Sequence, residues 1–301
     1  MELLTYSQNR KYSLNRTHQS SWLGRLSWFV FLFVFLSFGF SSSLYSETYN
    51  FTNAGKSGNT GPSQSQVNSS YSGTSLDGLV TVSNGIQKWV VPVSGTYTIT
   101  TIGATGGNSG ETTAYVGHPA KMVGDFELTA GDILHILVGQ KGHQGSTRPG
   151  WGGGGGTFVA KGSTYSVADP LIVSGGAGST HDNMTSQGET AQSASLTENG
   201  KSGTGGSGGG TNGNGGQTGQ KGHGGDGAGF YGNGSTGNNA LYMQVQASHT
   251  TPQSFRNGGN GDSVGGGFGG GGGVTNTYGG GAGGYSGGQG GRSGPYAGGG
   301  G

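Results

Sequence analysis

Two lysines stand in a context that is typical of phosphate-binding loops. The tripeptides Gly55-Lys56-Ser57 and Gly200-Lys201-Ser202 match the end of such a loop. The loop also needs a glycine five positions before the Gly-Lys pair, so that backbone N–H groups can surround the phosphates. The chain has Asn50 and Ser195 at those places. We therefore interpret both lysines as turn or loop residues.

The histidines and acidic residues form no recognisable metal motif. Zinc sites need ligands at fixed spacing, yet no two histidines here stand two positions apart and H-E-x-x-H is absent. The run from Gly258 to Asp262 resembles part of a calcium-binding nonapeptide, but its aspartate comes one place early and it has no tandem copies. The histidines are His18, His118, His135, His143, His181, His223 and His249. We interpret them as surface or loop residues and predict no metal site.

Enzymatic activity is not predicted either. Kinase signatures such as H-R-D and D-F-G are missing, and so is the strand lysine that accompanies a glycine-rich loop. The chain has no cysteine, which excludes disulfides, thiol nucleophiles and thiolate metal ligands together. We predict no catalytic residue and no cofactor.

Composition limits the class of partner and leaves open whether the chain is folded or disordered. Lysine plus arginine number 14 against 13 acidic residues, so the chain lacks the basic surface that nucleic-acid binding needs. With 74 glycines and 29% hydrophobic residues, the composition by itself is typical of low-complexity chains. Interleaved aromatic residues point the other way, because disordered segments are poor in them. These residues, interpreted either as core or as a binding face, are Trp151, Phe158, Phe230, Tyr231, Tyr242, Phe255, Phe268, Tyr278, Tyr285 and Tyr296.

The glycine clusters predict close backbone packing. The stretch Pro149–Gly162 runs from five consecutive glycines into the apolar residues Thr157–Ala160, and Leu171–Gly178 runs from an apolar strand into glycines. Without Cβ atoms, extended three-residue-per-turn helices can pack side by side, as collagen chains do at their axis. A local three-residue register of glycines, from Gly213 to Gly225, agrees with a bundle of polyglycine-II helices. Collagen itself is excluded, because strict Gly-X-Y order and abundant proline are lacking.

The amino-terminal part predicts export. Residues 1–25 form a basic leader, and Leu26–Phe40 carries no charge. We expect one hydrophobic helix over residues 26–46, either a cleaved signal peptide or a retained transmembrane signal-anchor, with everything beyond residue 46 outside the cell. Sequons that fit export begin at Asn50, Asn68, Asn183 and Asn233, and we expect N-glycosylation there.

Residues 49–140 read as a β-sandwich-like region, and residues 141–301 as the glycine-rich region. Turn dipeptides at Asp77-Gly78 and Asn84-Gly85 flank a short apolar run. The alternation over Ala120–Leu128 is typical of a half-buried strand. The expected strands are Leu79–Val82, Ile86–Val91, Thr96–Ile102, Ala120–Leu128 and Leu134–Val138. No amphipathic helix is expected after residue 46, so the predicted fold class is all-β.

Ordered motifs along residues 49–301 resemble the glycine-rich ectodomain family of the anaplastic lymphoma kinase and leukocyte tyrosine kinase receptors. They are FTNAGKSGNTGPSQSQVNSSY from Phe51, NGIQKWVVPVSGTYTITTIGATGG from Asn84, ILHILVGQKG from Ile133, GGGGGTFV from Gly152, LIVSGGAG from Leu171 and FRNGGNGDSVGGGFGGGGG from Phe255. The resemblance implies a tumour-necrosis-factor-like β-sandwich whose chain departs into a bundle of polyglycine-II helices. It also implies an extracellular module that binds small protein ligands.

This sequence departs from the family pattern in two ways. The family usually carries a cysteine at the places that Ala54 and Val67 occupy here, so the disulfide that the resemblance would imply is lost as a unit. The sequence also stops at Gly301, before the last strand that the family pattern would return to the sheet.

Three functional hypotheses follow. The first is a non-enzymatic extracellular or cell-surface recognition module that binds a protein or glycan ligand on a rigid, uncharged glycine scaffold. It would be attached to the membrane through residues 26–46 if they are not cleaved. The second is the ectodomain part of a receptor tyrosine kinase, and the third is a secreted structural matrix protein.

Overall fold

The protein is all-β apart from two short helices in its described residues. The computed structural model describes residues 4–9, 47–107, 117–144, 150–179, 193–206, 208–217, 224–237, 249–274, 278–291 and 298–301. The strands are β1 (Leu4–Asn9), β2 (Thr48–Phe51), β3 (Val80–Ser83), β4 (Ile86–Val90), β5 (Gly95–Ile102), β6 (Lys121–Leu128), β7 (Ile133–Leu137), β8 (Thr157–Lys161) and β9 (Asp169–Ser174). The helices are α1 (Gln64–Tyr71) and the 3-10 helix η3 (Phe255–Asn257).

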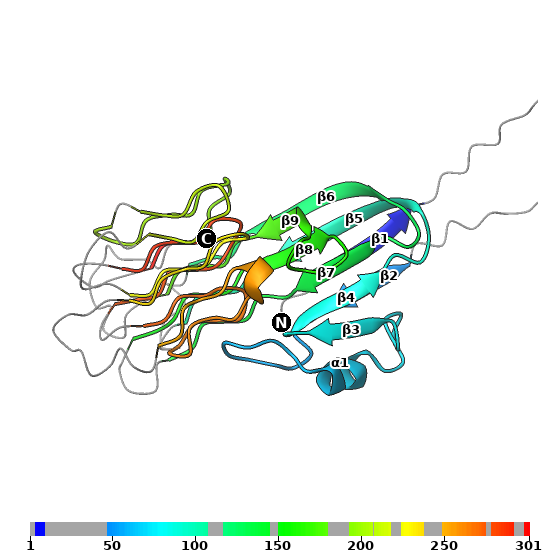
Figure 1. The fold of residues 1–301 in the computed structure, drawn as a ribbon, viewed down its shortest axis with the longest axis horizontal. Coiled ribbons are helices and arrows are strands. Elements are labelled where there is room, and N and C mark those ends of the chain that lie inside the picture. Colours follow the sequence, from blue (N-terminus) through cyan, green and yellow to red (C-terminus); the bar gives the residue numbers. More distant parts are fainter. Residues whose placement is uncertain are drawn as a thin grey trace, which may run out of the picture.

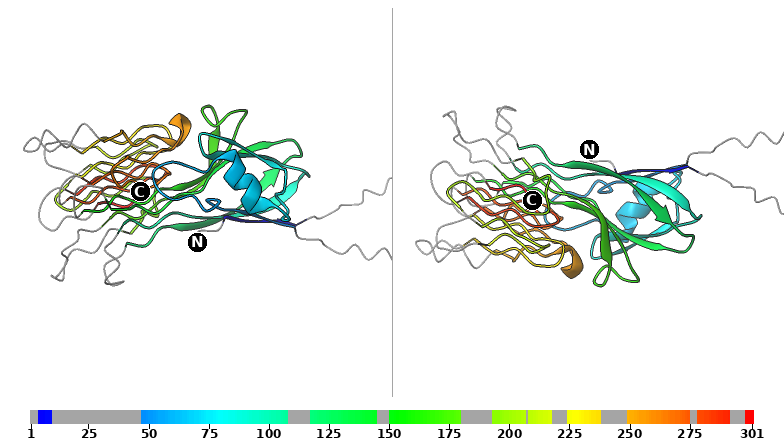
Figure 2. Two further views of the ribbon diagram at one scale, coloured as in Figure 1. Left: turned by 90° about the horizontal axis from the view of Figure 1, so that it is seen from below. Right: turned by 90° about the horizontal axis from the view of Figure 1, so that it is seen from above.

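The strands form two antiparallel sheets that face each other across one core. One sheet has the order β2-β1-β5-β6 and the other the order β3-β4-β7-β8-β9 (Figure 1). Both sheets contribute to the same hydrophobic cluster, with Tyr97 and Ile99 from β5 on one side and Trp89 from β4 on the other. The Trp89 ring lies 4.7 Å from that of Tyr49 and 5.9 Å from that of Phe51, measured between centroids. The glycine-rich segments extend from one end of these layers (Figure 2).

Local sequence explains most strands. Asn84 and Gly85 both have positive φ, 51° and 77°, and they connect β3 to β4 as the two-residue turn that such dipeptides favour. Along β5, every second side chain is buried, which is the pattern of a sheet with one covered face. The five strands expected between residues 79 and 138 are all present, with ends shifted by a residue at most. The apolar runs beside the glycine clusters form β8 and β9, so the glycine-rich region also contributes strands.

We expected no amphipathic helix after residue 46, but a short helix, α1, forms at Gln64–Tyr71 and buries one side. Ser63 caps its first turn: its Oγ accepts from the Gln66 N–H, and the Gln66 side chain accepts from the Ser63 N–H. Only Val67 and Tyr71 of this helix are buried. Two apolar positions in a serine-rich stretch are too few for a visible helical period, although the capping pair was a usable signal.

The strands β1 and β2 were not expected either. Leu4–Asn9 belongs to the range that we read as a basic leader, yet it pairs with β2 on one side and β5 on the other. The expectation that residues 1–25 form a basic leader stays a prediction. The hydrophobic segment 26–46 lies outside the described residues. Within the described part of the chain, no helix has the length and apolar character to cross a membrane.

A second apolar cluster joins the glycine-rich region to the outer face of the five-stranded sheet. It contains Leu137 and Phe158 from the sheet, and Phe230, Phe255 and Phe268 from the glycine-rich region. The rings of Phe230 and Phe255 are stacked with centroids 4.8 Å apart. Because β8 is covered on both faces, four of its five residues are buried.

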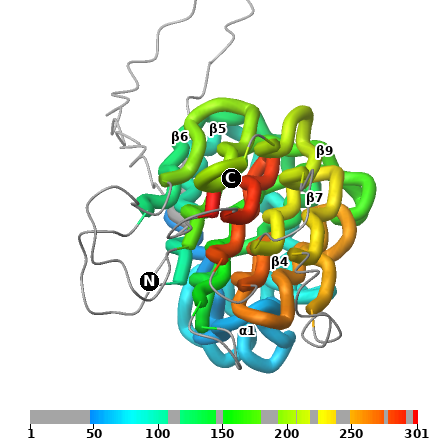
Figure 3. Tube along the Cα trace, turned by 90° about the vertical axis from the view of Figure 1, so that its left-hand side faces the viewer, coloured from blue at the N-terminus to red at the C-terminus, as the bar shows by residue number. Residues whose placement is uncertain are grey.

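Backbone hydrogen bonds in the glycine-rich region change partner with a period of three residues. Gly152 and Gly155 donate to the segment 140–143, Gly153 and Gly156 to the segment 269–272, and Gly154 to Ala177. The segments 225–229 and 280–284 follow the same rule with their own three neighbours. Each of these segments is therefore surrounded by hydrogen-bonded neighbours. Figure 3 shows the extended segments running side by side, seen from the end of the region.

This packing leaves no room for side chains. A Cβ atom on Gly155 would overlap the carbonyl oxygen of Phe268, and one on Gly153 would overlap that of Gly281. The backbone bonds that glycine allows here replace the side-chain contacts of an ordinary core. This explains how a chain with few hydrophobic residues forms an ordered second layer of packing.

Candidate functional site

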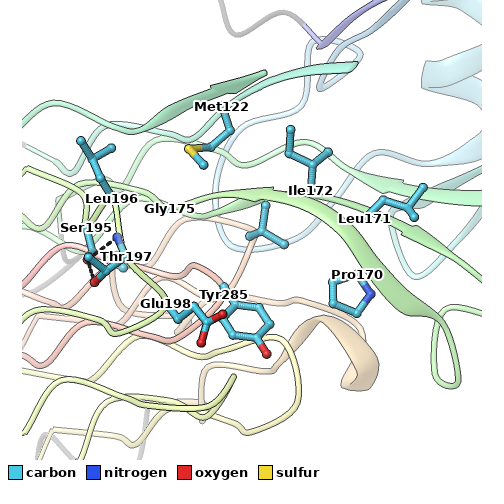
Figure 4. A pocket seen from close by; sticks show the side chains of 12 residues that line it. Met122, Pro170, Leu171, Ile172, Gly175, Ser195, Leu196, Thr197, Glu198 and Tyr285 are labelled. Carbon is cyan, nitrogen blue, oxygen red and sulfur yellow. Dashed lines mark hydrogen bonds between the residues drawn. The ribbon is translucent and has the colours of Figure 1, made fainter. Parts of the chain in front are cut away.

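The candidate site is an open groove of about 490 Å³ between β9, the end of β6 and the glycine-rich region (Figure 4). We call it the β9 groove. It is lined by Met122, Pro170, Leu171, Ile172, Val173, Gly175, Ser195, Leu196, Thr197, Glu198, Tyr285 and Gly301.

The sheets supply one wall of the β9 groove. β9 and β6 are edge strands of different sheets, and hydroxyl groups hold β9 against β5. Ile172 is 9% exposed because it also belongs to the shared core, and Leu171 packs partly against that core. This wall is therefore backed by well-packed residues and presents a largely preformed apolar surface.

The loop Ser195–Glu198 supplies the opposite wall. The Ser195 N–H donates to the Gly301 carbonyl at 2.9 Å, which fixes the start of the loop on the glycine-rich region. The Thr197 N–H donates to Ser195 Oγ at 3.2 Å, so the hydroxyl closes a local turn. Leu196 is at the tip of this turn with 76% of its surface exposed. An exposed leucine beside an apolar wall is a typical feature of a contact surface.

Tyr285 and Glu198 give the β9 groove its polar end. The Phe230 N–H donates to the Tyr285 carbonyl at 2.8 Å, and the Tyr285 ring packs beside the second apolar cluster. Burial raises the pKa of the Tyr285 hydroxyl, and the nearby Tyr231 and Glu198 raise it further. The phenol therefore stays neutral at physiological pH and can both donate and accept a hydrogen bond.

An anchored arginine supports the aromatic residues at this end. Arg256 donates to the Ala168 carbonyl from Nε at 3.1 Å and from Nη2 at 2.9 Å. Its guanidinium carbon lies 4.7 Å from the centroid of the Tyr231 ring, within cation–π range. Tyr231 in turn meets Tyr285 edge to face at 6.3 Å. These contacts fix the ring of Tyr231 beside the groove.

This arrangement is suited to binding. It combines aliphatic walls, one phenol and one carboxylate, the mixture that is typical of recognition sites. Among the residues that line the groove, no histidine or lysine stands beside a hydroxyl to activate it. Within the described residues, no group of three or more histidine, aspartate or glutamate side chains could hold a metal ion.

The three sequon asparagines within the described residues are not among the residues that line the groove. Asn50 is exposed on β2, and Asn68 is exposed on α1, where its Oδ1 accepts from Gln64 Nε2 at 2.7 Å. Asn233 is exposed, and its Oδ1 accepts from the Ser254 N–H at 2.9 Å. Asn183 lies outside the described residues. Glycosylation at these four positions stays a prediction.

The motifs that resembled ligand-binding loops have structural roles. Lys56 belongs to a tight turn, in which its N–H donates to the Asn53 carbonyl at 2.9 Å. Lys201 lies in an extended segment whose N–H donates to Gly300. The Asp262 carboxylate is buried and accepts from His249 Nδ1 and from the Val264 N–H, each at 2.8 Å.

The aromatic residues of the glycine-rich region divide between the two interpretations. The phenylalanines Phe158, Phe230, Phe255 and Phe268 are core residues, each at most 1% exposed. Tyr231 is 38% exposed and Tyr285 lines the β9 groove, so these two tyrosines contribute to the protein surface. Tyr242 and Tyr296 lie outside the described residues. The groove has no sequence motif, because its lining comes from separate parts of the chain.

These features define an all-β module with a preformed surface groove, and comparison with known proteins gives it a partial relative. No protein-family model matches the chain. The mouse leukocyte tyrosine kinase receptor is 37% identical to it over 97 residues, which is 31% of this chain. The matched segment spans 11% of the receptor, so the chain corresponds to a small part of that protein. The likeness is compatible with an extracellular receptor module.

Proposed function

We propose that this chain is a non-enzymatic extracellular or cell-surface recognition module, and that its β9 groove binds a segment of a protein ligand. The observation that carries the proposal is the pairing of the backed apolar wall at Ile172 with the exposed Leu196 across the groove. Aliphatic walls with few polar groups favour an apolar protein segment over a glycan, which needs many hydrogen-bonding partners. A glycan ligand is the alternative outcome of the test.

We further propose that the two sheets form a tumour-necrosis-factor-like sandwich and that the glycine segments are polyglycine-II helices. The three-residue period of the hydrogen-bond partners supports the second assignment, since such helices have three residues per turn. In this arrangement the glycine bundle is a rigid scaffold that supports one wall of the β9 groove.

The second candidate function is the ectodomain part of a receptor tyrosine kinase. The partial likeness to the leukocyte tyrosine kinase receptor favours it. A transcript that encodes this chain together with a kinase domain would establish it. A secreted structural matrix protein is a third candidate, and concentration-dependent assembly of the purified protein without any partner would favour that function.

The binding proposal is tested with a display library of secreted proteins and an array of oligosaccharides. The purified glycosylated protein is used as the probe, beside a Leu196→Asp variant and a Val167→Asp control. Val167 is 59% exposed and does not line the groove, so the control adds the same charge elsewhere. We expect a protein ligand whose affinity falls roughly tenfold or more in Leu196→Asp alone, as for a central contact residue. Equal affinity for all three proteins would exclude the groove as the binding site, and specific capture of oligosaccharides alone would replace the protein ligand with a glycan.

A further inference from the structure

The strand β6 forms an outer edge of the four-stranded sheet, where Figure 1 shows it at the margin of the molecule. Within the described part of the chain, it pairs with β5 alone. The outer strands of the other sheet are protected: Gln64 accepts a hydrogen bond from the edge of β3, and Pro170 in β9 has no N–H group to donate. Among the described residues, no loop or side chain of another element covers the backbone of β6 in this way. An uncovered edge strand can pair with another chain.

The pairing of β6 with β5 shows which of its backbone groups are free. The Gly103 N–H donates to the carbonyl of Ala120 at 3.0 Å, and these two residues continue the register of the β5–β6 pair. Backbone groups of an antiparallel strand point alternately to its two sides, so the even-numbered residues of β6 face β5. The residues whose N–H and C=O groups point to the free edge are Lys121, Val123, Asp125 and Glu127.

These four residues form a pattern that is complementary to itself. When a second β6 runs antiparallel about Gly124, Lys121 of one copy lies opposite Glu127 of the other, and Val123 lies opposite Asp125. Directly opposite residues share one face of a sheet, so opposite charges attract in both Lys–Glu pairs. Lys121 also has Asp125 of the other copy as a diagonal neighbour. The charges that would repel many foreign strands therefore favour a second copy of this strand.

Other registers of the same strand are less favourable. Antiparallel pairing about Val123 leaves Glu127 without an opposite residue in β6, and pairing about Asp125 places two aspartates opposite each other. A parallel pair in register places Lys121 beside its own copy. Like charges directly opposite destabilise a strand pair. Pairing about Gly124 is therefore the register that uses all the free residues and both opposite charges.

Exposed apolar side chains on β6 support the same register. Val123 is 58% exposed and Met122 is 36% exposed. In the pair about Gly124, the two Val123 side chains are diagonal neighbours, and Met122 lies opposite Phe126 of the second copy. Contacts between a methionine sulfur and an aromatic ring are favourable. Pairing would thus cover apolar surface that a single copy exposes to water.

We propose that β6 is a dimer interface, in which a second copy of this chain adds its own β6 antiparallel about Gly124. The two four-stranded sheets then form one continuous sheet across the contact. Because a two-fold axis relates the copies, the same surface is used on both sides and the assembly closes at two. This distinguishes the dimer from a structural matrix, whose assembly would continue. The proposal does not depend on a ligand in the β9 groove.

The experiment measures the mass of the purified full chain by sedimentation equilibrium over a range of concentrations, without any ligand. Lys121→Glu and Glu127→Lys are made as separate variants. Each places like charges opposite each other, and we expect the dimer dissociation constant to rise roughly tenfold or more. Mixed in equal amounts, the two variants should form a heterodimer, because each Lys–Glu pair is then complementary again. Rescue by mixing also shows that both variants are folded.

Val123→Pro tests the backbone pairing. It removes an N–H group at the free edge, a position where edge strands tolerate proline. We expect this variant to melt cooperatively but to remain monomeric. If it does not fold, the two charge variants and their mixture decide the question. The proposal is overturned if the unchanged protein is monomeric at every concentration, if the charge variants dimerise equally well, if mixing them gives no rescue, or if the assembly grows beyond two copies.

Discussion

The hydroxyl groups of Thr101 and Ser174 lie 2.6 Å apart and connect the two sheets at the point where the glycine segments begin. Both residues are fully buried, and Ser174 Oγ also lies 2.9 Å from the Thr101 carbonyl, to which it donates. Thr101 is on β5 and Ser174 on β9, so this contact joins strands of different sheets. It fixes the wall of the β9 groove relative to the shared core.

Removing this contact should destabilise the fold. Ser174→Ala leaves the buried Thr101 hydroxyl without its partner, and we expect a loss of about 1–3 kcal/mol in the free energy of unfolding. Thr164 and Ser166 form a similar pair at 2.9 Å on the surface, so Ser166→Ala is the matched control. Chemical denaturation of the three proteins measures the difference. Equal losses of unfolding free energy in Ser174→Ala and Ser166→Ala would show that the contact between the sheets stabilises the fold no more than a surface contact does.

A single methyl group in the glycine bundle should be more damaging than any hydroxyl deletion. Gly155→Ala places a Cβ against the carbonyl oxygen of Phe268, and rigid backbone on both sides prevents relief. We expect a loss of about 3 kcal/mol or more, or failure to fold. Gly124→Ala is the control, because its Cβ would meet side chains and no backbone: the ring of Phe126 at 3.0 Å, which can rotate, and Ile172 Cδ1 at an ordinary contact distance of 3.8 Å. Thermal melting of both variants tests this, and a Gly155→Ala protein with unchanged stability would contradict tight backbone packing.

Stability should fall as the solution becomes acidic. Burial lowers the pKa of His135, whose Nε2 lies 3.0 Å from the Gly162 carbonyl, and burial also lowers the pKa of His143. With a folded pKa below the unfolded value of about 6.5, protonation favours the unfolded chain. The stabilisation of the folded state that comes from keeping His135 and His143 neutral is therefore fully present above pH 6.5 and decreases below it. Denaturation between pH 5 and pH 8 should show this slope, and a His135→Gln variant should have a shallower one; identical slopes would exclude His135.

The side chain of Gln64 closes the outer edge of the five-stranded sheet. Its Oε1 accepts from the Val82 N–H at 2.8 Å, and its Nε2 donates to the Val80 carbonyl at 2.9 Å, as the backbone of a further strand would do. Gln64→Ala keeps a good helix former in α1 but exposes the edge of β3. We expect a loss of about 1–2 kcal/mol and increased self-association in light scattering. When the proteins are expressed without N-glycosylation, Asn68→Ala removes only the bond that orients Gln64 and should associate less than Gln64→Ala. A Gln64→Ala protein with unchanged stability and association would show that the edge needs no cover.

The sequence predicts the strands well where a repeating pattern exists. The alternation in Ala120–Leu128 and the Asn84-Gly85 turn each depend on neighbouring residues, so their signals are local. The helix α1 was not predicted because it has only two buried apolar residues, Val67 and Tyr71, which are too few to show a helical period. Ala54 and Val67, the two places where the resemblance implies cysteines, are both buried in the shared core.

The β9 groove could not be found in the same way. Its walls meet only after the chain has passed through both sheets and the glycine region, and residues such as Leu196 and Tyr285 have no motif around them. β1 was missed for a similar reason, since its partners are distant in sequence and the charges that follow it at Arg10 and Lys11 favoured a leader. Both features depend on contacts between residues that are far apart in the sequence, and no local sequence pattern predicts such contacts.

The three-residue alternation of hydrogen-bond partners restricts how the glycine segments can change in length. An insertion of one or two residues would turn the rest of a segment by a third or two thirds of a turn, so each following N–H would face the wrong neighbour. An insertion of three would restore the orientation and only lengthen the segment. Related chains should therefore differ freely in the turns at the far end of the bundle, but within the segments only by whole triplets.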